Sequence, residues 1–258
     1  MRALLAAIRC DKGDVDGNLA AHLGLLDRAA AEGCALALFP EMSLTGSADP
    51  AAHPERLIGL DHPAVTALAA ATGETGVAAC FGVAERAPGG VAERVPGGVP
   101  HITQVVAASG RVSGVQRKRH LGEGEEAFTA AGQTTVFDHA GARFGVAICA
   151  EAGFDGPFDA AAAAGARLVL FPAAAGLYGR RTDEASWRRG FDWWEGSALG
   201  DARRHARRWG LWIALAGQAG STADEDFPGL AALVGPDGEV TDRLPDWRPG
   251  VLLVDVPG

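Results

Sequence analysis

The sequence predicts a layered α/β fold built on a mixed sheet or on two sheets. Short apolar segments typical of strands alternate with helical segments early and late in the chain, which is the pattern of α/β proteins. Hairpin turns join several strands in the middle, so part of the sheet is expected to be antiparallel. No linker or shift of composition divides the 258 residues. We therefore expect a single domain over residues 1–258.

The first half of the chain contains strands of buried character and helices with one apolar stripe. Residues 14–32 form the clearest helix, which Gly33 ends. Its stripe consists of Leu19, Leu23, Leu26 and Ala30. The expected helices are 14–32 and 62–74, and the expected strands are 3–9, 35–39, 76–84, 102–108 and 112–118.

A short duplication lies inside this half. Residues 84–91 are repeated as residues 92–99, and each copy contains Pro-Gly-Gly, which favours a turn. The period is far too short for a solenoid. We therefore expect the elongated tip of a hairpin, because lengthening a loop costs little entropy.

The second half repeats the alternation around one long helix. Trp187, Phe191 and Trp194 lie on one face of that helix, over residues 186–209. Its last turns carry several arginines, which the helix dipole favours at this end. The other expected helix is 160–164, and the expected strands are 134–139, 142–148, 168–171, 211–216, 230–234, 239–243 and 251–256.

Composition argues against several classes of function. The net charge of −9 disfavours binding to nucleic acid or to an anionic membrane surface, since both need a basic face. No segment approaches the roughly 20 apolar residues of a membrane span. The four cysteines are widely separated, which predicts reduced thiols and a cytoplasmic protein. The seven histidines show no metal-ligand spacing, so we expect neither a metal nor another cofactor.

Three of the expected strands end in a reactive side chain. Glu41 follows strand 35–39, Lys118 ends strand 112–118, and Cys149 follows strand 142–148. A lone cysteine in such a place is more often a core residue. A carboxylate, an ammonium and a thiol, each at the end of an apolar strand, are instead expected to meet at one rim of the sheet.

At these positions the chain resembles the nitrilase, or carbon–nitrogen hydrolase, superfamily. Residues 38–46 (LFPEMSLTG) are similar to its glutamate motif, residues 117–121 (RKRHL) to its lysine motif and residues 147–151 (AICAE) to its cysteine motif. Residues 214–220 and 234–238 resemble a later strand and hairpin of the family. The resemblance implies a four-layer αββα sandwich in a single domain, and a homodimer formed through the helix after Cys149 and the long Trp-bearing helix.

The resemblance implies hydrolysis of a non-peptide carbon–nitrogen bond through a cysteine thioester, and the chemistry of the residues is consistent with that. Cys149 would be the nucleophile and Glu41 the general base. Lys118 and the backbone N–H of Ala150 would stabilise the oxyanion. The resemblance also places a further glutamate at Glu126, where it would position the substrate or the lysine; Glu123 and Glu125 are competing candidates.

The expected substrate is a small linear amide of ω-amide or N-carbamoyl type. Its hydrolysis would release an acid together with ammonia or an amine. Candidate pocket residues are Tyr178, Arg180 and Glu151, the last standing where the family often has aspartate. Nitrile hydrolysis by the same three groups and a sensor without catalysis remain alternatives. A third is a hydrolase of the Cys–His–Asp type with His139 or His205 as base, although Cys149 lacks the flanking glycines of a nucleophile elbow.

Overall fold

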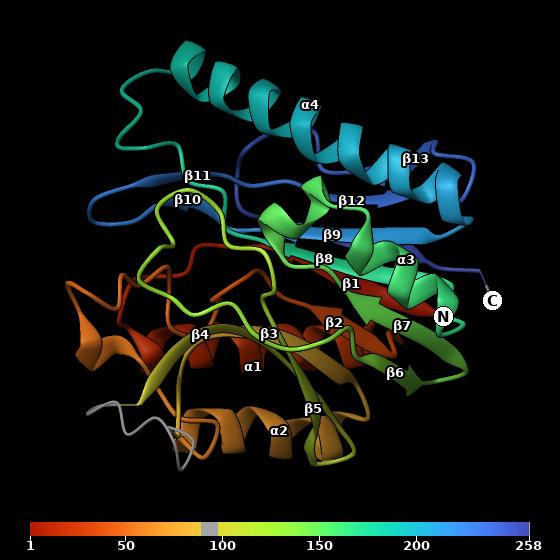
Figure 1. Ribbon diagram of the computed structural model, residues 1–258, viewed down its shortest axis with the longest axis horizontal. Helices are drawn as coiled ribbons and strands as arrows, with labels where there is room; N and C mark the ends of the chain where they lie inside the picture. Colours follow the sequence, from red (N-terminus) through yellow and green to blue (C-terminus); the bar gives the residue numbers. More distant parts are fainter. Residues whose placement is uncertain (89–97, 258) are drawn as a thin grey trace.

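The computed structural model describes residues 1–88 and 98–257. Two six-stranded sheets pack face to face, and one pair of helices covers the outer face of each (Figure 1). The predicted four-layer αββα sandwich is therefore confirmed. The expected hairpin tip lies partly in residues 89–97, outside the described residues.

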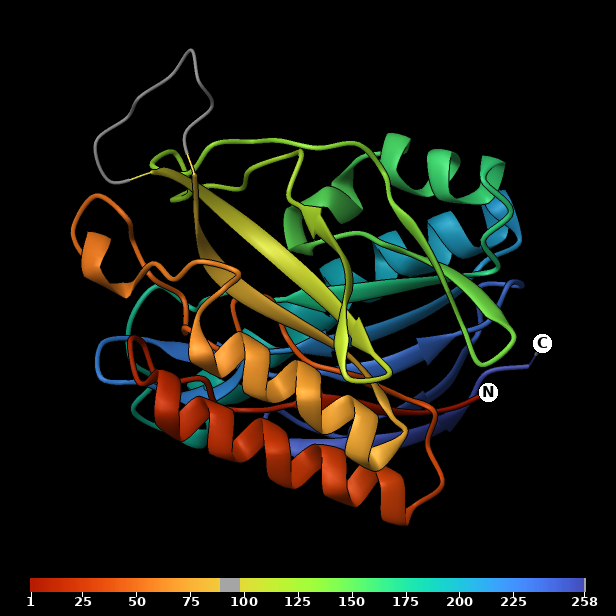
Figure 2. The ribbon, with the colours of Figure 1, turned by 90° about the horizontal axis from the view of Figure 1, so that it is seen from below.

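The first sheet is formed by the N-terminal half of the chain and the last strand. Its order is β14 (Gly250–Asp255), β1 (Arg2–Ala7), β2 (Leu36–Leu38), β3 (Ala78–Ala87), β4 (Val99–Ala108) and β5 (Arg111–Arg117). The central strands β1, β2 and β3 are parallel, and the outer pairings are antiparallel. Helices α1 (Val15–Ala31) and α2 (Pro63–Thr75) lie side by side over its outer face (Figure 2).

The second sheet repeats this plan. Its order is β13 (Val240–Arg243), β12 (Ala231–Val234), β9 (Trp212–Gly217), β8 (Leu168–Ala173), β7 (Ala142–Val146) and β6 (Val136–His139), with β7, β8 and β9 parallel. Helices α3 (Gly156–Ala163) and α4 (Glu184–Trp209) cover it. A small hairpin of β10 (Ala219–Ser221) and β11 (Asp226–Pro228) was not expected from the sequence. Two 3₁₀ helices complete the fold, η1 (Pro54–Arg56) and η2 (Cys149–Gly153).

Three apolar cores follow from these layers. The inner core lies between the sheets and contains Leu5, Leu38, Ile148 and Leu170, all fully buried. An outer core lies on each side, between a sheet and its helices. In α4 Phe191 and Trp194 face this outer core, so most of the predicted aromatic stripe packs inward.

The buried face of α1 is turned slightly from the predicted stripe. The most buried positions are Asn18, His22, Leu26 and Ala29, whereas Leu19 and Leu23 lie at its flank. Two polar side chains are buried because they hydrogen-bond the segment after β2, which apolar periodicity does not reveal.

The topology brings the carboxyl ends of both sheets to one place. Strand β5 runs in the direction of β2 and β3, because two antiparallel pairings separate it from β3. The segments after β2 and β5 therefore start at the same edge. A parallel bridge between Ile8, after β1, and Gln218, after β9, joins this edge to the corresponding edge of the second sheet. Residues that follow β2, β5 and β7 thus converge.

The segment after β2 crosses β3 at very short range, and Gly82 makes this possible. A Cβ atom at Gly82 would lie 2.1 Å from the backbone nitrogen of Met42. No real contact is this short, so the backbone of residues 40–42 approaches β3 only because position 82 has no side chain.

Replacing Gly82 with alanine should therefore destabilise the protein by about 1–3 kcal/mol, the usual cost of forcing an atom into a packed core. The free energy of unfolding in urea measures this. Gly24→Ala is the matched control, because a Cβ there meets nothing within 4 Å. That control should be neutral or stabilising, by up to about 1 kcal/mol, through helix propensity. Equal stability of Gly82→Ala and the wild type would contradict the close approach.

Candidate active site

Glu41 lies at the bottom of the site, directly after β2 and Phe39-Pro40. Its residue is only 1% exposed. The chain turns sharply here, because Met42 has a φ of +48° and Gly46 a φ of +70°. This turn points the carboxylate away from the strand direction and into the junction of the two sheets.

A hydrogen-bonded chain holds the turn against α1 and β3. His22 Nδ1 lies 2.6 Å from the carbonyl oxygen of Asn18, so it must carry the proton. His22 Nε2 then accepts from Ser43 Oγ at 2.9 Å, and Ser43 Oγ accepts from the N–H of Gly82 at 3.1 Å. Each donor in this series of hydrogen bonds meets an acceptor, so the turn that carries Glu41 has one defined position.

Two glutamine side chains fix the backbone on either side of the carboxylate. Gln218 Nε2 donates to the carbonyl oxygen of Glu41 at 2.8 Å, and Gln104 Nε2 donates to that of Phe39 at 3.1 Å. Gln218 belongs to the segment 214–220 that resembles a family strand, and it reaches across from the second sheet. Both sheets therefore hold the same turn.

Lys118 follows β5 and is fully buried among carboxylates. Its Nζ donates to Glu41 Oε1 at 2.7 Å and to Glu125 Oε1 at 2.6 Å. The additional glutamate beside the lysine is thus Glu125 and not the expected Glu126, which is exposed and bonds only the nearby N–H of Gly124. The turn sets this choice: Gly124 has a φ of +83°, and Glu125 Oε2 accepts from the N–H of Gly122 at 2.6 Å.

The two arginines beside Lys118 each pair with a different buried carboxylate. Arg117 donates to both oxygens of Glu85 at 2.7 and 2.6 Å. Arg119 donates to both oxygens of Glu151, each at 2.8 Å. Three consecutive cations are therefore anchored to four separate segments, which contain Glu85, Glu41, Glu125 and Glu151, and Lys118 in the centre has little freedom to move.

Cys149 begins the η2 turn after β7. Its φ of +45° is in the left-handed region, which is uncommon for a residue with a side chain and typical of strained functional positions. The N–H of Ile148 donates to Glu151 Oε2 at 2.8 Å, and this bond ties the strand end to the turn. Cys149 is partly exposed, whereas the other three cysteines are buried.

Glu151 is a structural tether and not a pocket residue as predicted. Its side chain is fully buried, and its oxygens accept from Arg119 and from the backbone N–H groups of Arg119 and Ile148. It thereby links the lysine segment to the cysteine segment. The sequence offered no sign of this pairing, because Arg119 and Glu151 are 32 positions apart.

The electrostatics of the cluster are set by burial and by the short distances. Burial raises the pKa of Glu41; Lys118 opposes this shift and Glu125 adds to it. Burial, assisted by Glu41, also raises the pKa of the Cys149 thiol. Burial alone would lower the pKa of Lys118, but Glu41, Cys149 and Glu125 raise it well above its usual range. These shifts favour the thiol form of Cys149 and the ammonium form of Lys118, and they make Glu41 a stronger base than an exposed carboxylate.

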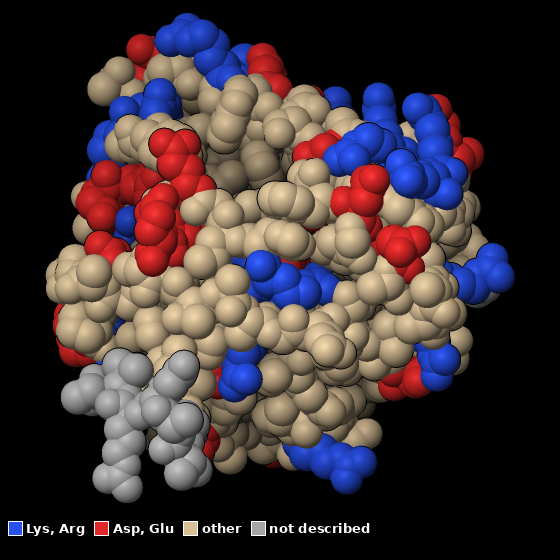
Figure 3. All heavy atoms as spheres, in the orientation of Figure 1, with Lys and Arg blue, Asp and Glu red and all other residues tan. Residues whose placement is uncertain are grey.

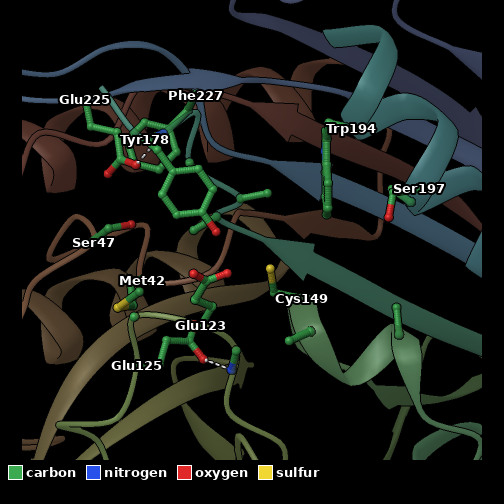
Figure 4. Close-up of a pocket in the computed structure, with 18 of the residues that line it drawn as sticks. Met42, Ser47, Glu123, Glu125, Cys149, Tyr178, Trp194, Ser197, Glu225 and Phe227 are labelled. Carbon is green, nitrogen blue, oxygen red and sulfur yellow. Dashed lines mark hydrogen bonds between the residues drawn. The ribbon is translucent and has the colours of Figure 1, made fainter. Parts of the chain in front are cut away.

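A cavity of about 510 Å³ opens beside Cys149 and leads to the surface. The surface is hollowed below α4, and acidic side chains border the hollow (Figure 3). Figure 4 shows Cys149 between Trp194 on one side and Met42 and Glu125 on the other. The aromatic lining residues are Phe128, Phe171, Tyr178, Trp193, Trp194 and Phe227. Ala150, which follows Cys149 in the chain, also lines the cavity.

Of the predicted pocket residues, Tyr178 lines the cavity and Arg180 does not. Arg180 donates to the carbonyl oxygens of Thr222 and Ala223 and pairs with the buried Asp226 at 3.2 Å. It holds the β10–β11 hairpin in place. The sequence did not identify Phe171, Trp193 and Trp194 as residues of the cavity, because periodicity assigns apolar side chains at such positions to the core.

Neither histidine of the alternative hydrolase type is placed to act on Cys149. His139 Nε2 hydrogen-bonds the carbonyl oxygen of Ala35, and His205 Nε2 bonds that of Ala152 at 2.7 Å. Within residues 1–88 and 98–257 no group of three or more His, Cys, Asp or Glu side chains is arranged to hold a metal ion. None of the described helices has the length and apolar character needed to cross a bilayer.

Comparison with known proteins agrees with this geometry. The sequence profile of the carbon–nitrogen hydrolases matches residues 4–258. No curated protein matches the chain. Among solved structures, a glutamate-to-glutamine mutant of the amidase from Nesterenkonia sp. AN1, with acrylamide added at the active-site cysteine, is 25% identical. Its TM-score is 0.81, and the match covers 100% of this chain and 93% of that one.

Two further structures of the same amidase are 26% identical to this chain, each with a TM-score of 0.81. One is a glutamate-to-glutamine mutant that carries the acetamide moiety of fluoroacetamide at the active-site cysteine; 100% of this chain and 90% of that chain are covered. The other is a cysteine-to-alanine mutant in complex with butyramide, with 100% and 91% covered. A related mutant structure assigns that amidase to the nitrilase superfamily.

The buried histidine that holds the glutamate turn should make the protein sensitive to acid. Burial lowers the pKa of His22 from 6.5 to about 4. The unfolded chain therefore binds a proton at higher pH than the folded one, and stability falls as the pH drops from about 6.5 to about 4. The loss attributable to His22 is about 3 kcal/mol.

His22→Gln keeps hydrogen-bonding groups without a titration, so it should flatten the dependence of unfolding free energy on pH in this window. Part of the slope should remain, because burial also lowers the pKa of His205. Urea unfolding at a series of pH values measures both effects. An unchanged slope in His22→Gln would show that this histidine is not the group that titrates.

The Arg119–Glu151 ion pair should contribute far more to the free energy of unfolding than an exposed ion pair does. Glu151→Gln leaves a buried arginine without its counter-charge, and we expect a cost of about 3–5 kcal/mol. Asp138→Asn is the matched control, because Asp138 and Arg143 make a similar bidentate pair with side chains 64% and 48% exposed. That control should change the unfolding free energy only slightly, because the exposed pair is screened by solvent. Similar costs for the two variants would argue against a tether.

Proposed function

The chain belongs to the carbon–nitrogen hydrolase family, and from that premise we propose that it hydrolyses a small linear amide to an acid and ammonia through a thioester on Cys149. The observation that carries this proposal is the position of Lys118. Its ammonium bridges Glu41 and Glu125 within a buried cluster that also contains the partly exposed thiol. A base, a cation and a nucleophile are thus preassembled beside one cavity.

The first half of the proposed reaction acylates the enzyme. The Cys149 sulfur attacks the amide carbon while Glu41 accepts the thiol proton. Burial raises the pKa of Glu41 and so makes it a stronger base, which offsets the raised pKa of the thiol. The negative charge that develops on the carbonyl oxygen is stabilised by Lys118 and by the backbone N–H of Ala150. Glu41 then passes its proton to the departing nitrogen, the carbon–nitrogen bond breaks, and ammonia leaves a thioester.

The second half releases the acid. Water takes the place of ammonia, Glu41 removes one of its protons, and the oxygen attacks the thioester carbon. The same two donors stabilise the second oxyanion. The carbon–sulfur bond then breaks, and the proton on Glu41 returns to Cys149.

In this scheme Glu125 is a positioning residue. It binds the Lys118 ammonium together with Glu41 and keeps it charged, because a second carboxylate favours the ammonium form. The ligands named for the related amidase, acrylamide, butyramide and the acetamide moiety of fluoroacetamide, are all short, which supports a small amide here. ω-Amides and N-carbamoyl compounds fall within this proposal, and a nitrile is the second candidate because it needs the same groups.

Assembly as a homodimer remains part of the proposal. Trp193 on α4 is 52% exposed, and exposed tryptophan is enriched in interfaces between proteins. The neighbouring Phe191 and Trp194 face inward, so they do not add to this surface.

Activity should depend steeply on the three reacting side chains. Cys149→Ala should abolish ammonia release from short amides, Glu41→Gln should lower kcat by roughly 10²–10⁴, and Lys118→Met should lower it by about 10²–10³. Mass spectrometry of the wild type mixed with substrate should detect an acyl group on Cys149. Iodoacetamide should alkylate this cysteine first, because the other three are buried.

Cys34→Ala is the matched control, and it should retain both turnover and alkylation. Undiminished ammonia release by Cys149→Ala would end the proposal. Turnover of nitriles but not of amides would favour the second candidate.

A further inference from the structure

We propose that the pocket selects amides whose acyl chain ends in a positively charged group, and that the Glu123 carboxylate with the Tyr178 ring receives that group. This inference deepens the proposed function and rests on it. The cavity is a ligand site on independent grounds, since Cys149 lines it and the amidase it resembles carries bound amides. What remains to be derived is the charge of the ligand.

The charged residues of the cavity are almost all acidic. The carboxylates that line it are Asp49, Glu123, Glu125, Asp201 and Glu225. Of the 23 lysines and arginines in the chain, Lys12 alone lines it among the described residues. A cavity with walls of low dielectric concentrates such a one-sided field, so a ligand of opposite charge is favoured.

Most of these carboxylates already have ion-pair partners, and among the described lining residues only Asp49 and Glu123 have none. Glu125 pairs with Lys118, and Asp201 accepts from Arg204 at 2.8 Å. The Lys12 ammonium forms ion pairs with the carboxylates of Asp224 and Glu225, with N–O distances of 3.0 and 3.2 Å, so these two carboxylates already compensate its charge.

Asp49 Oδ1 accepts a hydrogen bond from the N–H of Ala51 at 2.9 Å, whereas the Glu123 carboxylate has neither a hydrogen bond nor an ion pair within the described residues. Within residues 1–88 and 98–257 Glu123 makes no ion pair at 4.0 Å or less. It is exposed, and it lines the same cavity as Cys149. An uncompensated carboxylate therefore lies where a substrate must pass.

The turn that places Glu125 also aims Glu123. Gly122 and Gly124 flank it, and the left-handed Gly124 reverses the chain so that both glutamates face the cavity. In Figure 4 the Glu123 carboxylate and the Tyr178 hydroxyl point toward each other across the mouth of the pocket, near Cys149. The negative charge of Glu123 contributes to raising the pKa of Tyr178, after burial, which agrees with this proximity.

Tyr178 supplies a second, independent feature of a cation site. Its residue is 72% exposed and has a φ of +51°, so the backbone is held in an unusual conformation that leaves the ring uncovered beside the cavity. Trp193, also exposed, lies along the same wall. An aromatic face next to a carboxylate binds ammonium and guanidinium groups through the ring quadrupole and the charge together.

The same arrangement disfavours substrates with a carboxylate. Arg180 would be the nearest candidate to bind one, but it is held by Asp226 and by two carbonyl oxygens. A carboxylate at the mouth of the pocket would face Glu123 and Glu225 without a free cation among the described lining residues.

Three amides of matched shape test the inference: valeramide, its ω-amino derivative and its ω-carboxy derivative. The kcat/KM for ammonia release should be highest for the ω-amino compound, intermediate for valeramide and lowest for the ω-carboxy compound. Each step in this series should change kcat/KM by about tenfold, the effect of one charge pair at the surface of a pocket. Raising the salt concentration should narrow the differences, because exposed charges are screened.

Glu123→Gln should lower the ratio of kcat/KM for the ω-amino compound to that for valeramide by about tenfold, and Glu123→Lys should invert the order of the two charged compounds. Glu126→Gln is the matched control. Glu126 is also an exposed glutamate, three positions after Glu123, but it does not line the cavity. The variant therefore loses the same charge and should keep the wild-type ratio of the two kcat/KM values.

Protection of Cys149 from iodoacetamide by the same three compounds measures binding without turnover. Equal protection and equal kcat/KM across the series, or an unchanged ratio in Glu123→Gln, would overturn the charge selection and leave the amidase proposal intact. If no compound is hydrolysed or acylates Cys149, the proposed function fails, and the order of protection still decides the charge preference.

Discussion

The buried ammonium of Lys118 is the interaction on which the site depends. A lysine without solvent is costly unless its charge is compensated, and here two carboxylates lie within 2.7 Å of its nitrogen. The energetic cost of burying the ammonium also explains why the two carboxylates lie so close to it. Because neither carboxylate can be withdrawn without weakening the compensation of a buried charge, Glu41 and Glu125 are held where the proposed reaction needs them. The same contacts therefore serve both stability and the proposed catalysis.

The surroundings of Lys118 extend this logic to the neighbouring residues. Arg117 and Arg119 point to opposite partners, Glu85 on β3 and Glu151 in the cysteine turn. The strand end of β5 is thereby fixed to both sheets. Such a network of short bonds limits the small displacements that would separate Glu41, Lys118 and Cys149. The electrostatic preorganisation expected of this family follows from the packing of charged side chains and not from the loops alone.

Much of this could be read from the sequence, for identifiable reasons. Glu41, Lys118 and Cys149 each follow an apolar strand, and a parallel arrangement brings such positions to one edge. The choice of Glu126 over Glu125 was wrong, because the conformation of Gly124 decides which carboxylate turns inward. Glu151 was placed in the pocket, although it pairs with Arg119. The sequence contains no local sign of a contact between residues 32 positions apart. Arg180 and the buried polar face of α1 were misjudged for the same reason.

The pairing of β14 with β1 has a consequence for how the molecule is made. Residues 250–255 complete the first sheet by lying beside residues 2–7, and the amino group of Met1 donates to the carbonyl oxygen of Val256 at 2.6 Å. During synthesis, β1 must wait for almost the whole chain before its outer edge is covered. Until then an apolar strand has open backbone groups on that side, which is a condition that invites association with other chains. The exposed edge of β1 is therefore covered only once residues 250–255 have been made and have paired with it.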